Sequence, residues 1–200
     1  MTEQYPDCEI MRLNSLPECL MSVEKGISDF AILDSMVIVG SNLRERGMQV
    51  NFCLYDYLPI ASAFRFEDED MRKQYNEFLA EINRSGLVNE IKGRWMSDNA
   101  ASSDMPTINM PTSGTPFRVG VLNNDFPLSF IKHGQFAGYE IELMYRFSVY
   151  LGRPVELVAL EFSSMMPALN SNKIDMITCF LSVTEERSKN VLFSDPYYQC

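Results

Sequence analysis

Several residue types and patterns are scarce in this chain of 200 residues, and each scarcity excludes a class of protein. Glycine and proline, with ten residues each, are too few and too scattered for a fibrous or low-complexity chain. No apolar run approaches the roughly 18–20 residues of a membrane span. Basic residues are also few, with 17 Lys and Arg against 27 Asp and Glu. The resulting formal net charge of −10 opposes binding to nucleic acid.

Histidine and paired cysteines are scarce as well. The chain has one histidine and five cysteines, and the cysteines lack the paired spacing of a zinc or redox site. We therefore expect no metal centre, no cofactor and no His-dependent nucleophile. The cysteines are expected to be free or buried thiols, with a single disulfide left open as the alternative. What the chain does contain, 46 % apolar and 22 % charged residues, is typical of a folded globular protein.

A polar stretch from about Ser97 to Thr115 divides the chain in two. It is rich in Ser, Thr, Asn, Ala, Pro and Gly, and its apolar residues follow neither a helical nor an alternating pattern. We therefore expect residues 1–98 to form one segment, residues 99–115 a linker and residues 116–200 a second segment.

The first segment predicts helices and one short strand. Ser15 begins a capping box with a proline in the first turn, which predicts a helix that ends near Gly26. Residues 29–34 form a short apolar run that ends on a carboxylate, as a buried parallel strand does. Apolar stripes over residues 71–82 and 87–95 predict two further helices.

The second segment alternates predicted strands and helices. Strands are expected over residues 117–122, 155–160 and 174–180, and helices over residues 139–151 and 163–170. Strand, helix and strand repeated in this way predict an α/β fold with parallel strands and right-handed crossovers. Ligands of such sheets bind beyond the carboxyl ends of the strands, so the residues that follow each strand are the candidates for binding.

The strand ends carry distinctive side chains. Glu161 and Phe162 follow the second strand, and hydroxyl groups with Arg187 follow the third. A helix start with a hydroxyl, free N–H groups and a guanidinium group can bind a carboxylate. By spacing alone, the simpler assignment is a capping box at Ser182–Glu185, a surface charge at Arg187 and a core ring at Phe162.

Four stretches of the second segment match a known family, and they are FRVGVLNNDFPLSF, GYEIELMYRFSVYLG, MMPALNSNKIDMIT and LSVTEERSKNVLFSDPYY. The last stretch is the most specific of the four. On these motifs residues 116–200 resemble the opening half of a type 2 periplasmic solute-binding protein of family 3, the branch that binds polar amino acids. The resemblance implies a periplasmic-binding-protein-like II fold of the α/β class, with a parallel-sheet lobe.

Residues 15–98 resemble the closing half of the same family, on SVEKGISDFAILD and YLPIASAFRFEDEDMRKQYNEFLAEINRSGLVNEIKGRWMSD. The two halves therefore come in reversed order. We interpret the chain as a piece of a longer protein with two such domains in tandem, and a circular permutation is the alternative. In this family the closing helices and the opening half build one lobe. The resemblance therefore predicts that Phe78 and Trp95 are buried against the second segment.

The resemblance also implies the ligand contacts. Ser182 and Arg187 match the hydroxyl and guanidinium groups that hold the α-carboxylate of the ligand. Phe162 matches the aromatic ring that packs on the ligand side chain. Asp34 matches the carboxylate that holds the α-ammonium group, although it belongs to the other half-domain. We expect Ser182 and Arg187 at the start of one helix, open to solvent beside Phe162, with no fully buried carboxylate on Arg187.

Three further positions complete the expected site. Residues near Asp125 and Phe126 match the loop after the first strand, with a register that is fixed to about one position. Phe180 departs from the family, which usually has a small residue there, often glycine. A bulky side chain at this position is expected to crowd the backbone of a bound amino acid.

These features predict a binding module that takes up a small polar amino acid and delivers it to an ABC permease in the membrane. The module is expected to act outside the cytoplasm, in the periplasm or extracellular space. A sensor domain coupled to a membrane receptor is an alternative. A dehydratase-like enzyme on the same fold is a weaker one, because only Glu161 and Asp125 could supply an acid or base in the cleft. We expect no catalytic residue and no nucleic-acid partner.

Overall fold

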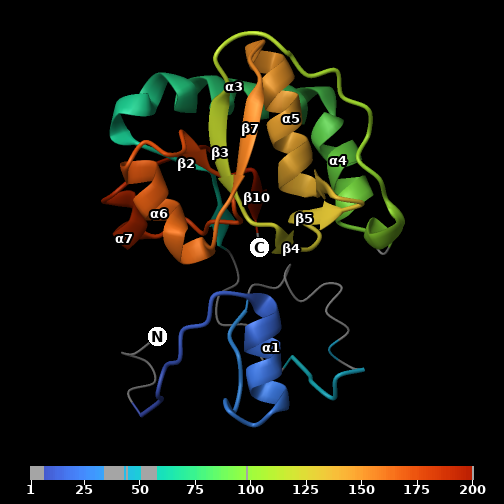
Figure 1. The fold of residues 1–200 in the computed structure, drawn as a ribbon, viewed down its shortest axis with the longest axis vertical. Helices are drawn as coiled ribbons and strands as arrows, with labels where there is room; N and C mark the ends of the chain where they lie inside the picture. The colour runs from blue at the N-terminus through green and yellow to red at the C-terminus, as the bar shows by residue number, and fades with distance from the viewer. Residues whose placement is uncertain (1–6, 34–42, 44, 51–57, 98, 200) are drawn as a thin grey trace.

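Two stretches that lie far apart in the sequence share one β-sheet in the computed structural model, which describes residues 7–33, 43, 45–50, 58–97 and 99–199. The sheet mixes parallel and antiparallel strands and forms the centre of the upper body in Figure 1. Its strands, in spatial order, are β7 (Val155–Ala159), β3 (Phe117–Val121), β8 (Met176–Ile177), β2 (Ala63–Phe64) and β9 (Leu192–Phe193).

The second segment forms the predicted parallel unit. Strand β3 pairs in parallel with β7 on one side and with β8 on the other. Helix α5 (Tyr139–Leu151) connects β3 to β7, and helix α6 (Phe162–Asn170) connects β7 to β8. The predicted β-α-β-α-β arrangement is confirmed, and so is the α/β class. The third strand is shorter than the predicted range 174–180, because only two of its residues pair with β3.

The first segment supplies strand β2, which lies antiparallel between β8 and β9. Ala63 pairs with Ile177 and with Phe193, so one dipeptide bridges two strands of the other segment. Successive side chains of a strand face opposite sides of the sheet. Accordingly Phe64 joins the core on the α5 side, and Ala63 joins the smaller core on the α6 side.

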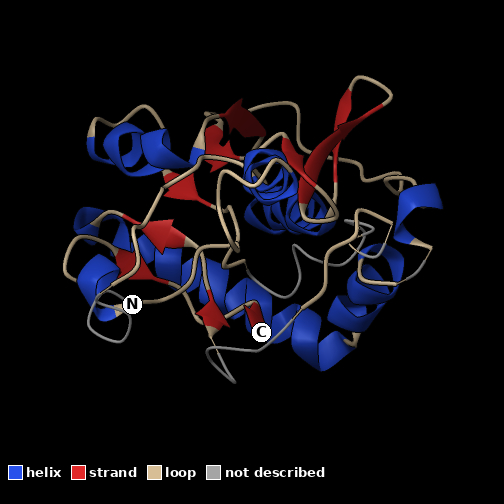
Figure 2. Ribbon diagram, turned by 90° about the horizontal axis from the view of Figure 1, so that it is seen from below, coloured by secondary structure: helices blue, strands red, loops and turns tan. Residues whose placement is uncertain are grey.

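Helices cover both faces of this sheet, as the view from below shows (Figure 2). Helix α3 (Glu69–Ser85) and helix α4 (Leu87–Trp95) pack against α5, which itself contacts β7, while α6 packs on β3 and β8 at the other face. Most of the predicted stripe residues of α3 and α4 are buried, and these are Tyr75, Phe78, Leu79, Ile82, Ile91 and Trp95. Met71 and Leu87 are only half-buried, and Val88, which was not predicted, is buried.

The predicted burial of Phe78 and Trp95 against the second segment is confirmed. The ring of Phe78 lies 5.4 Å from that of Phe147 on α5, and the ring of Trp95 lies 6.0 Å from that of Phe130. Both side chains are almost fully removed from water. Burial of aromatic side chains of this size is among the largest single contributions to a core.

A buried carboxylate joins the two segments beside this core. Glu142 of α5 accepts hydrogen bonds from Arg94 Nη1 at 2.7 Å and from Trp95 Nε1 at 2.7 Å. Arg146, one turn further along α5, donates to the same carboxylate from Nη2 at 2.7 Å. The Glu142 side chain is fully buried, and the two guanidinium groups compensate its charge.

The beginning of the first segment differs in part from prediction. Helix α1 (Leu16–Glu24) forms with Ser15 as its N-cap, as predicted. The predicted strand over residues 29–34 is wrong for the described residues 29–33, where no strand is present. A strand needs neighbours for its backbone hydrogen bonds, and no described strand pairs with this run. Phe30 and Ile32 are accordingly exposed.

The remaining elements are short. Strands β4 (Asn124–Asp125), β5 (Ser129–Lys132) and β6 (Gln135–Ala137) form an antiparallel sheet that the sequence analysis did not predict. Strand β1 (Pro59–Ile60) pairs with β10 (Tyr198–Gln199). Short helices are η1 (Phe66–Asp68), η2 (Ala100–Ser102) and α7 (Glu185–Ser188). Apart from η2, the described residues between α4 and β3 form no helix or strand.

Within the described ranges, every helix is too short or too polar to cross a lipid bilayer.

Candidate functional site

A cavity of about 340 Å³ lies where the carboxyl ends of the strands meet the region of α1. Leu122, Phe162 and Phe180, which follow β3, β7 and β8, line one side of it. Leu16 and Cys19 of α1 line the other side. Figure 1 shows α1 below the main body, at this end of the sheet. The cavity therefore lies at the edge where the sequence analysis expects a ligand.

Arg187 and Phe162 come together beside this cavity. The guanidinium carbon of Arg187 lies 5.6 Å from the centre of the Phe162 ring. The ring is 40 % exposed, and Arg187 is half-buried. Within the described part of the chain, no carboxylate forms an ion pair with Arg187, and its Nη1 donates to the carbonyl oxygen of Ser182 at 2.9 Å. The phenyl face stabilises the cation and leaves donors of the guanidinium group for an acidic ligand.

Ser182 precedes helix α7 and does not cap it. Thr184 is the N-cap, and its hydroxyl oxygen accepts the backbone N–H of Arg187 at 3.2 Å. The capping box considered at Ser182–Glu185 is therefore wrong, because the helix begins two residues later than that box requires. Ser182 is half-buried and forms a β-bridge with Ile60. Ser182 therefore contacts Arg187 through its carbonyl oxygen but lies outside helix α7.

The loop after β3 brings Asp125 and Asn124 to the cavity wall. Phe126 does not line the cavity, and its ring packs on Phe130 at 5.0 Å. Of the two loop residues named from the sequence, Asp125 is thus the one at the cavity. Asp34, the expected partner of an ammonium group, lies outside the described residues.

Phe180 has an unusual backbone at the cavity wall. Its φ angle is 51°, in the left-handed region that favours glycine, and its side chain is buried with the ring 5.6 Å from that of Tyr198. A non-glycine residue in this region costs about 1 kcal/mol or more. A bulky, buried residue thus lines the cavity at the position where the resemblance implies a small residue.

A buried carboxyl group supports this wall from behind. Glu140, at the start of α5, is fully buried, and its Oε1 accepts the backbone N–H of Phe180 at 2.6 Å and the hydroxyl of Tyr197. Burial, which outweighs the hydrogen bonds, raises the pKa of Glu140 to about 8. The sequence analysis missed this residue. The signal was a glutamate between Tyr139 and Ile141 in an apolar stretch of helix.

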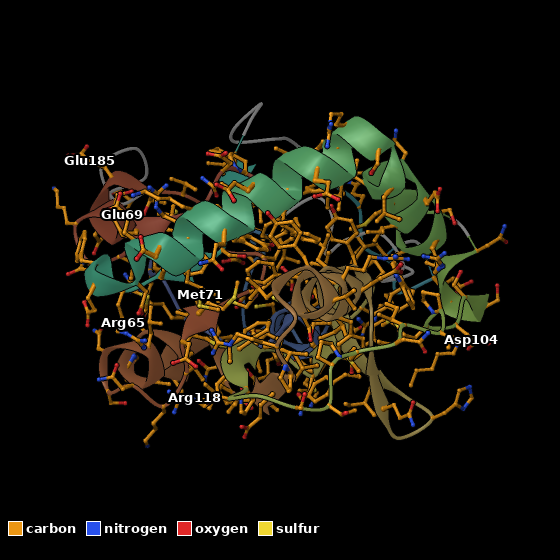
Figure 3. All side chains as sticks on the ribbon, turned by 90° about the horizontal axis from the view of Figure 1, so that it is seen from above. Arg65, Glu69, Met71, Asp104, Arg118 and Glu185 are labelled. Carbon is orange, nitrogen blue, oxygen red and sulfur yellow. The ribbon has the colours of Figure 1, made fainter. Side chains whose placement is uncertain are left out.

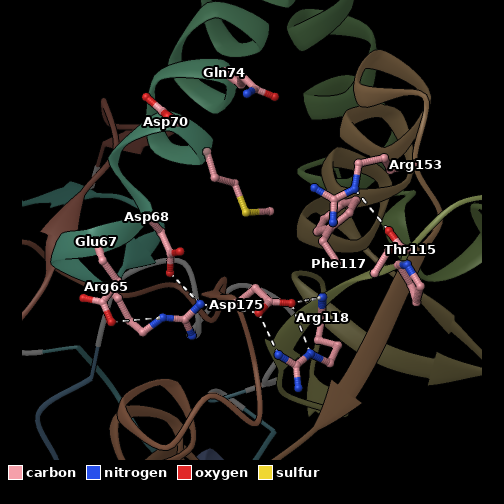
Figure 4. Close-up of a pocket in the computed structure, with 12 residues that line it drawn as sticks. Arg65, Glu67, Asp68, Asp70, Gln74, Thr115, Phe117, Arg118, Arg153 and Asp175 are labelled. Carbon is pink, nitrogen blue, oxygen red and sulfur yellow. Dashed lines mark hydrogen bonds and ion pairs between the residues drawn. The ribbon is translucent and has the colours of Figure 1, made fainter.

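A larger cavity of about 630 Å³ lies at the amino ends of the strands, opposite α1. Figure 3, viewed from that end, labels three of its lining residues, Arg65, Met71 and Arg118. Asp175 accepts from Arg118 Nη2 at 2.8 Å and forms an ion pair with Arg65 at 3.4 Å, and Asp68 pairs with Arg65 at 2.6 Å (Figure 4).

These charges are paired with one another, which favours a structural role for this end of the sheet. Burial of Asp175 disfavours its charged form, but the hydrogen bonds and the charge of Arg118, helped by Arg65, lower the pKa of this carboxyl group. Arg65 also donates to the carbonyl oxygen of Ile174 at 2.6 Å. The network thus ties the first segment to the loop before β8.

The candidate site suits binding of an organic acid with a hydrophobic part. It combines the exposed Phe162 ring, the Arg187 guanidinium group and the polar loop at Asp125. Among the described residues, no group of three His, Cys, Asp or Glu side chains could hold a metal ion. Cys179 lines the cavity as a free thiol, and burial raises its pKa well above the ordinary value.

Comparison with known proteins finds bacterial amino-acid-binding proteins. The family model of bacterial extracellular solute-binding proteins, family 3, matches residues 117–200. A probable histidine-binding protein of Campylobacter jejuni is 35 % identical over 128 residues, which is 64 % of this chain and 47 % of that protein. An L-arginine-binding protein of Pseudomonas aeruginosa is 29 % identical over 97 residues, 47 % of this chain and 38 % of that protein.

Among solved structures, an ancestral arginine-binding protein bound to arginine is 38 % identical, with a TM-score of 0.41, and the match covers 42 % of this chain and 37 % of that one. The chain spans about half or less of the length of these curated relatives. The similarity therefore concerns one part of such a protein.

Proposed function

We propose that this protein, whose residues 117–200 match the family model of bacterial extracellular solute-binding proteins, family 3, binds a polar amino acid at the carboxyl ends of β3, β7 and β8 for ABC-type transport. The observation that carries the proposal is the geometry of Arg187. Its guanidinium group lies over the exposed ring of Phe162 beside the cavity, without a carboxylate partner among the described residues.

In this proposal Arg187 holds the α-carboxylate of the ligand. A guanidinium group binds a carboxylate through charge-assisted hydrogen bonds, which are about twice as strong as neutral ones. The bond from Nη1 to the carbonyl oxygen of Ser182 fixes the direction of the side chain. Phe162 offers its exposed face to the apolar part of the ligand, and Ser182 lies close enough in sequence to contribute a hydroxyl group.

The proposed ligand class is a polar or basic amino acid. The names of the relatives above specify histidine and arginine. The net charge of −10 also favours approach of a cationic amino acid over an acidic one. Phe180 is proposed to limit the size of the ligand, because it lines the cavity at a position where the resemblance implies a small residue.

The wider role follows from the family. We propose that the protein acts outside the cytoplasm, in the periplasm or extracellular space, associated with the membrane through the full-length protein. We also propose that it binds without catalysing a reaction. The relatives named above are called binding proteins, which supports this view.

We further propose that residues 1–98 are the closing half of one solute-binding domain and residues 116–200 the opening half of another, joined by residues 99–115. Two features support this division. Strand β2 completes the sheet of the second segment, and α3 and α4 cover its helix α5. Such packing is expected when complementary halves of one lobe meet within a single chain.

Isothermal titration calorimetry of the 200-residue chain against a panel of L-amino acids tests the proposal. We expect binding of at least one of L-arginine, L-histidine and L-lysine, and Arg187→Ala should weaken it by about tenfold to a hundredfold. Lys189→Ala is the matched control, because Lys189 is an exposed cation near Arg187 and pairs with Glu185. Its affinity should stay within about twofold of the parent chain.

Two results would contradict the proposal. Absence of heat with every amino acid would show that this lobe alone does not bind them. Equal affinity of Arg187→Ala and the parent chain would show that Arg187 is a surface charge.

A further inference from the structure

Glu140 is a buried carboxyl group without an ion-pair partner. Glutamate is almost never fully buried unless it is paired, and Glu142, two residues further along α5, follows that rule through Arg94 and Arg146. Within the described ranges, no cationic side chain pairs with Glu140, and its Oε2 has no hydrogen-bond partner. The fold thus keeps a costly group in the core at this position.

The contacts of Glu140 join three parts of the lobe. From α5, Oε1 accepts the backbone N–H of Phe180 at the cavity wall. The same oxygen accepts the hydroxyl of Tyr197, just before β10. The backbone N–H of Tyr197 in turn donates to the carbonyl oxygen of Ile60 in β1 at 3.0 Å. One oxygen atom therefore connects the wall of the cavity to the paired strands β1 and β10.

The Phe180 backbone needs such a partner. The N–H of Phe180 is buried and donates to Glu140 Oε1, and a buried N–H left unpaired costs about 1–3 kcal/mol. Glu140 removes this cost and stabilises a conformation that a phenylalanine rarely adopts. The adjacent N–H of Ala61 donates to the carbonyl oxygen of Leu181 at 3.1 Å and fixes the chain after the turn.

We propose that Glu140 is a positioning residue, which holds the Phe180 turn in the shape that the candidate ligand site requires, through a hydrogen bond whose strength depends on whether the carboxyl group carries a proton. The proposal deepens the proposed function and rests on it, because the Phe180 turn lines the cavity assigned to the ligand.

Among the residues that the structure describes, no cationic side chain forms an ion pair with Glu140. Asp125 on the loop after β3 disfavours its ionised form, and Tyr197 and the N–H of Phe180 favour it. Cys179, Tyr75 and Tyr139 also interact with it electrostatically, and all three are neutral in their ordinary state. A change of pH around neutrality therefore changes the charge of Glu140, and none of these neighbouring groups offsets that change with an opposite one.

Nuclear magnetic resonance of the 200-residue chain tests the assignment directly. The amide proton of Phe180 should titrate in one step with a midpoint of about 8, because burial raises the pKa of Glu140 to that value. Glu140→Gln keeps the size of the side chain and an acceptor oxygen but cannot titrate, so this step should vanish. Glu156→Gln, at an exposed position of β7, should leave it unchanged.

A second variant keeps the test decisive if Glu140→Gln fails to fold. Tyr197→Phe removes one donor to the carboxylate and should move the midpoint of the Phe180 titration to higher pH. A Phe180 amide proton that does not titrate in the parent chain, or that still titrates in Glu140→Gln, would overturn the proposal. So would an unmoved midpoint in Tyr197→Phe.

The effect on binding is measured separately, with L-arginine as the probe at pH 9, above the pKa of about 8 of Glu140, so that its carboxyl group is ionised in the parent chain. Glu140→Gln should weaken its binding by about tenfold, the difference expected between a charged and a neutral hydrogen bond. Equal affinity would mean that the turn does not position the ligand and would refute the proposal. If the parent chain binds no amino acid, the proposed function fails, whereas the Phe180 titration still decides whether Glu140 holds the turn.

Discussion

Replacing Glu142 by alanine should destabilise the lobe more than any single change at its surface. The side chain is fully buried and accepts hydrogen bonds from Arg94, Trp95 and Arg146. Removal of one partner of a buried ion pair usually costs about 3–5 kcal/mol, because the remaining charge stays in the core. This contact joins α4 of the first segment to α5 of the second.

The structure places the expected loss toward the lower end of that range. The side chains of Arg94 and Arg146 are 26 % and 23 % exposed, so both guanidinium groups can regain water when the carboxylate is absent. Trp95 Nε1 is fully buried and would lose its acceptor, at a cost of about 1 kcal/mol. We expect a total loss of about 3–4 kcal/mol for Glu142→Ala and about 2 kcal/mol for Glu142→Gln, which keeps an acceptor oxygen.

Trp95 is also the natural probe for the measurement. It is the only tryptophan of the chain, and it lies at the contact that is removed. Urea unfolding followed by its fluorescence gives the free energy of unfolding for each variant. Glu156→Gln, an exposed control on β7, should change that free energy by less than about 0.5 kcal/mol. A loss below about 1 kcal/mol for Glu142→Ala would refute the reasoning, because the two segments would then not depend on this contact.

Three further outcomes follow from the structure. Because the pKa of Glu140 is raised from its ordinary value of 4.5 to about 8, the folded state retains a proton that the unfolded state has lost. The free energy of unfolding should therefore fall as pH rises from about 5 to 8, by up to about 4 kcal/mol relative to Glu140→Gln in parallel urea titrations. Phe180→Gly should relieve about 1 kcal/mol of backbone strain but lose about 3 kcal/mol of burial, so thermal unfolding should occur several degrees lower, and an unchanged melting temperature would contradict the packing. The pKa of Asp175 is lowered, so this carboxylate stabilises the folded state above pH 3.8, the ordinary pKa of the group. The stabilisation is lost as pH falls below that value. Asp175→Asn should therefore cost about 1–2 kcal/mol at pH 7 and much less at pH 3, and an equal cost at both would exclude the ion pairs as the cause.

Local sequence patterns were sufficient for the helices and the two longest strands. The apolar stripe of α3 and the glycine after α5 act within one or two turns, so they specify these elements without reference to the rest of the chain. The parallel unit of β3, β7 and β8 followed from the alternation of strand and helix. The motifs around Ser182 and Arg187 also identified the end of the sheet at which the candidate site lies.

Tertiary structure alone decided which of these elements meet. Strand β2 has two residues, too few for any periodic pattern, and exists because β8 and β9 supply partners on both sides. The apolar run over residues 29–33 has a stronger strand pattern and forms no strand, since no described strand lies beside it. In the same way, the burial of Glu140 and the left-handed backbone of Phe180 depend on α5, the cavity wall and Tyr197 coming together. A hydrogen bond between distant residues leaves no pattern in the sequence near either partner. The periodicity of a helix, by contrast, is visible in the spacing of apolar residues in each turn.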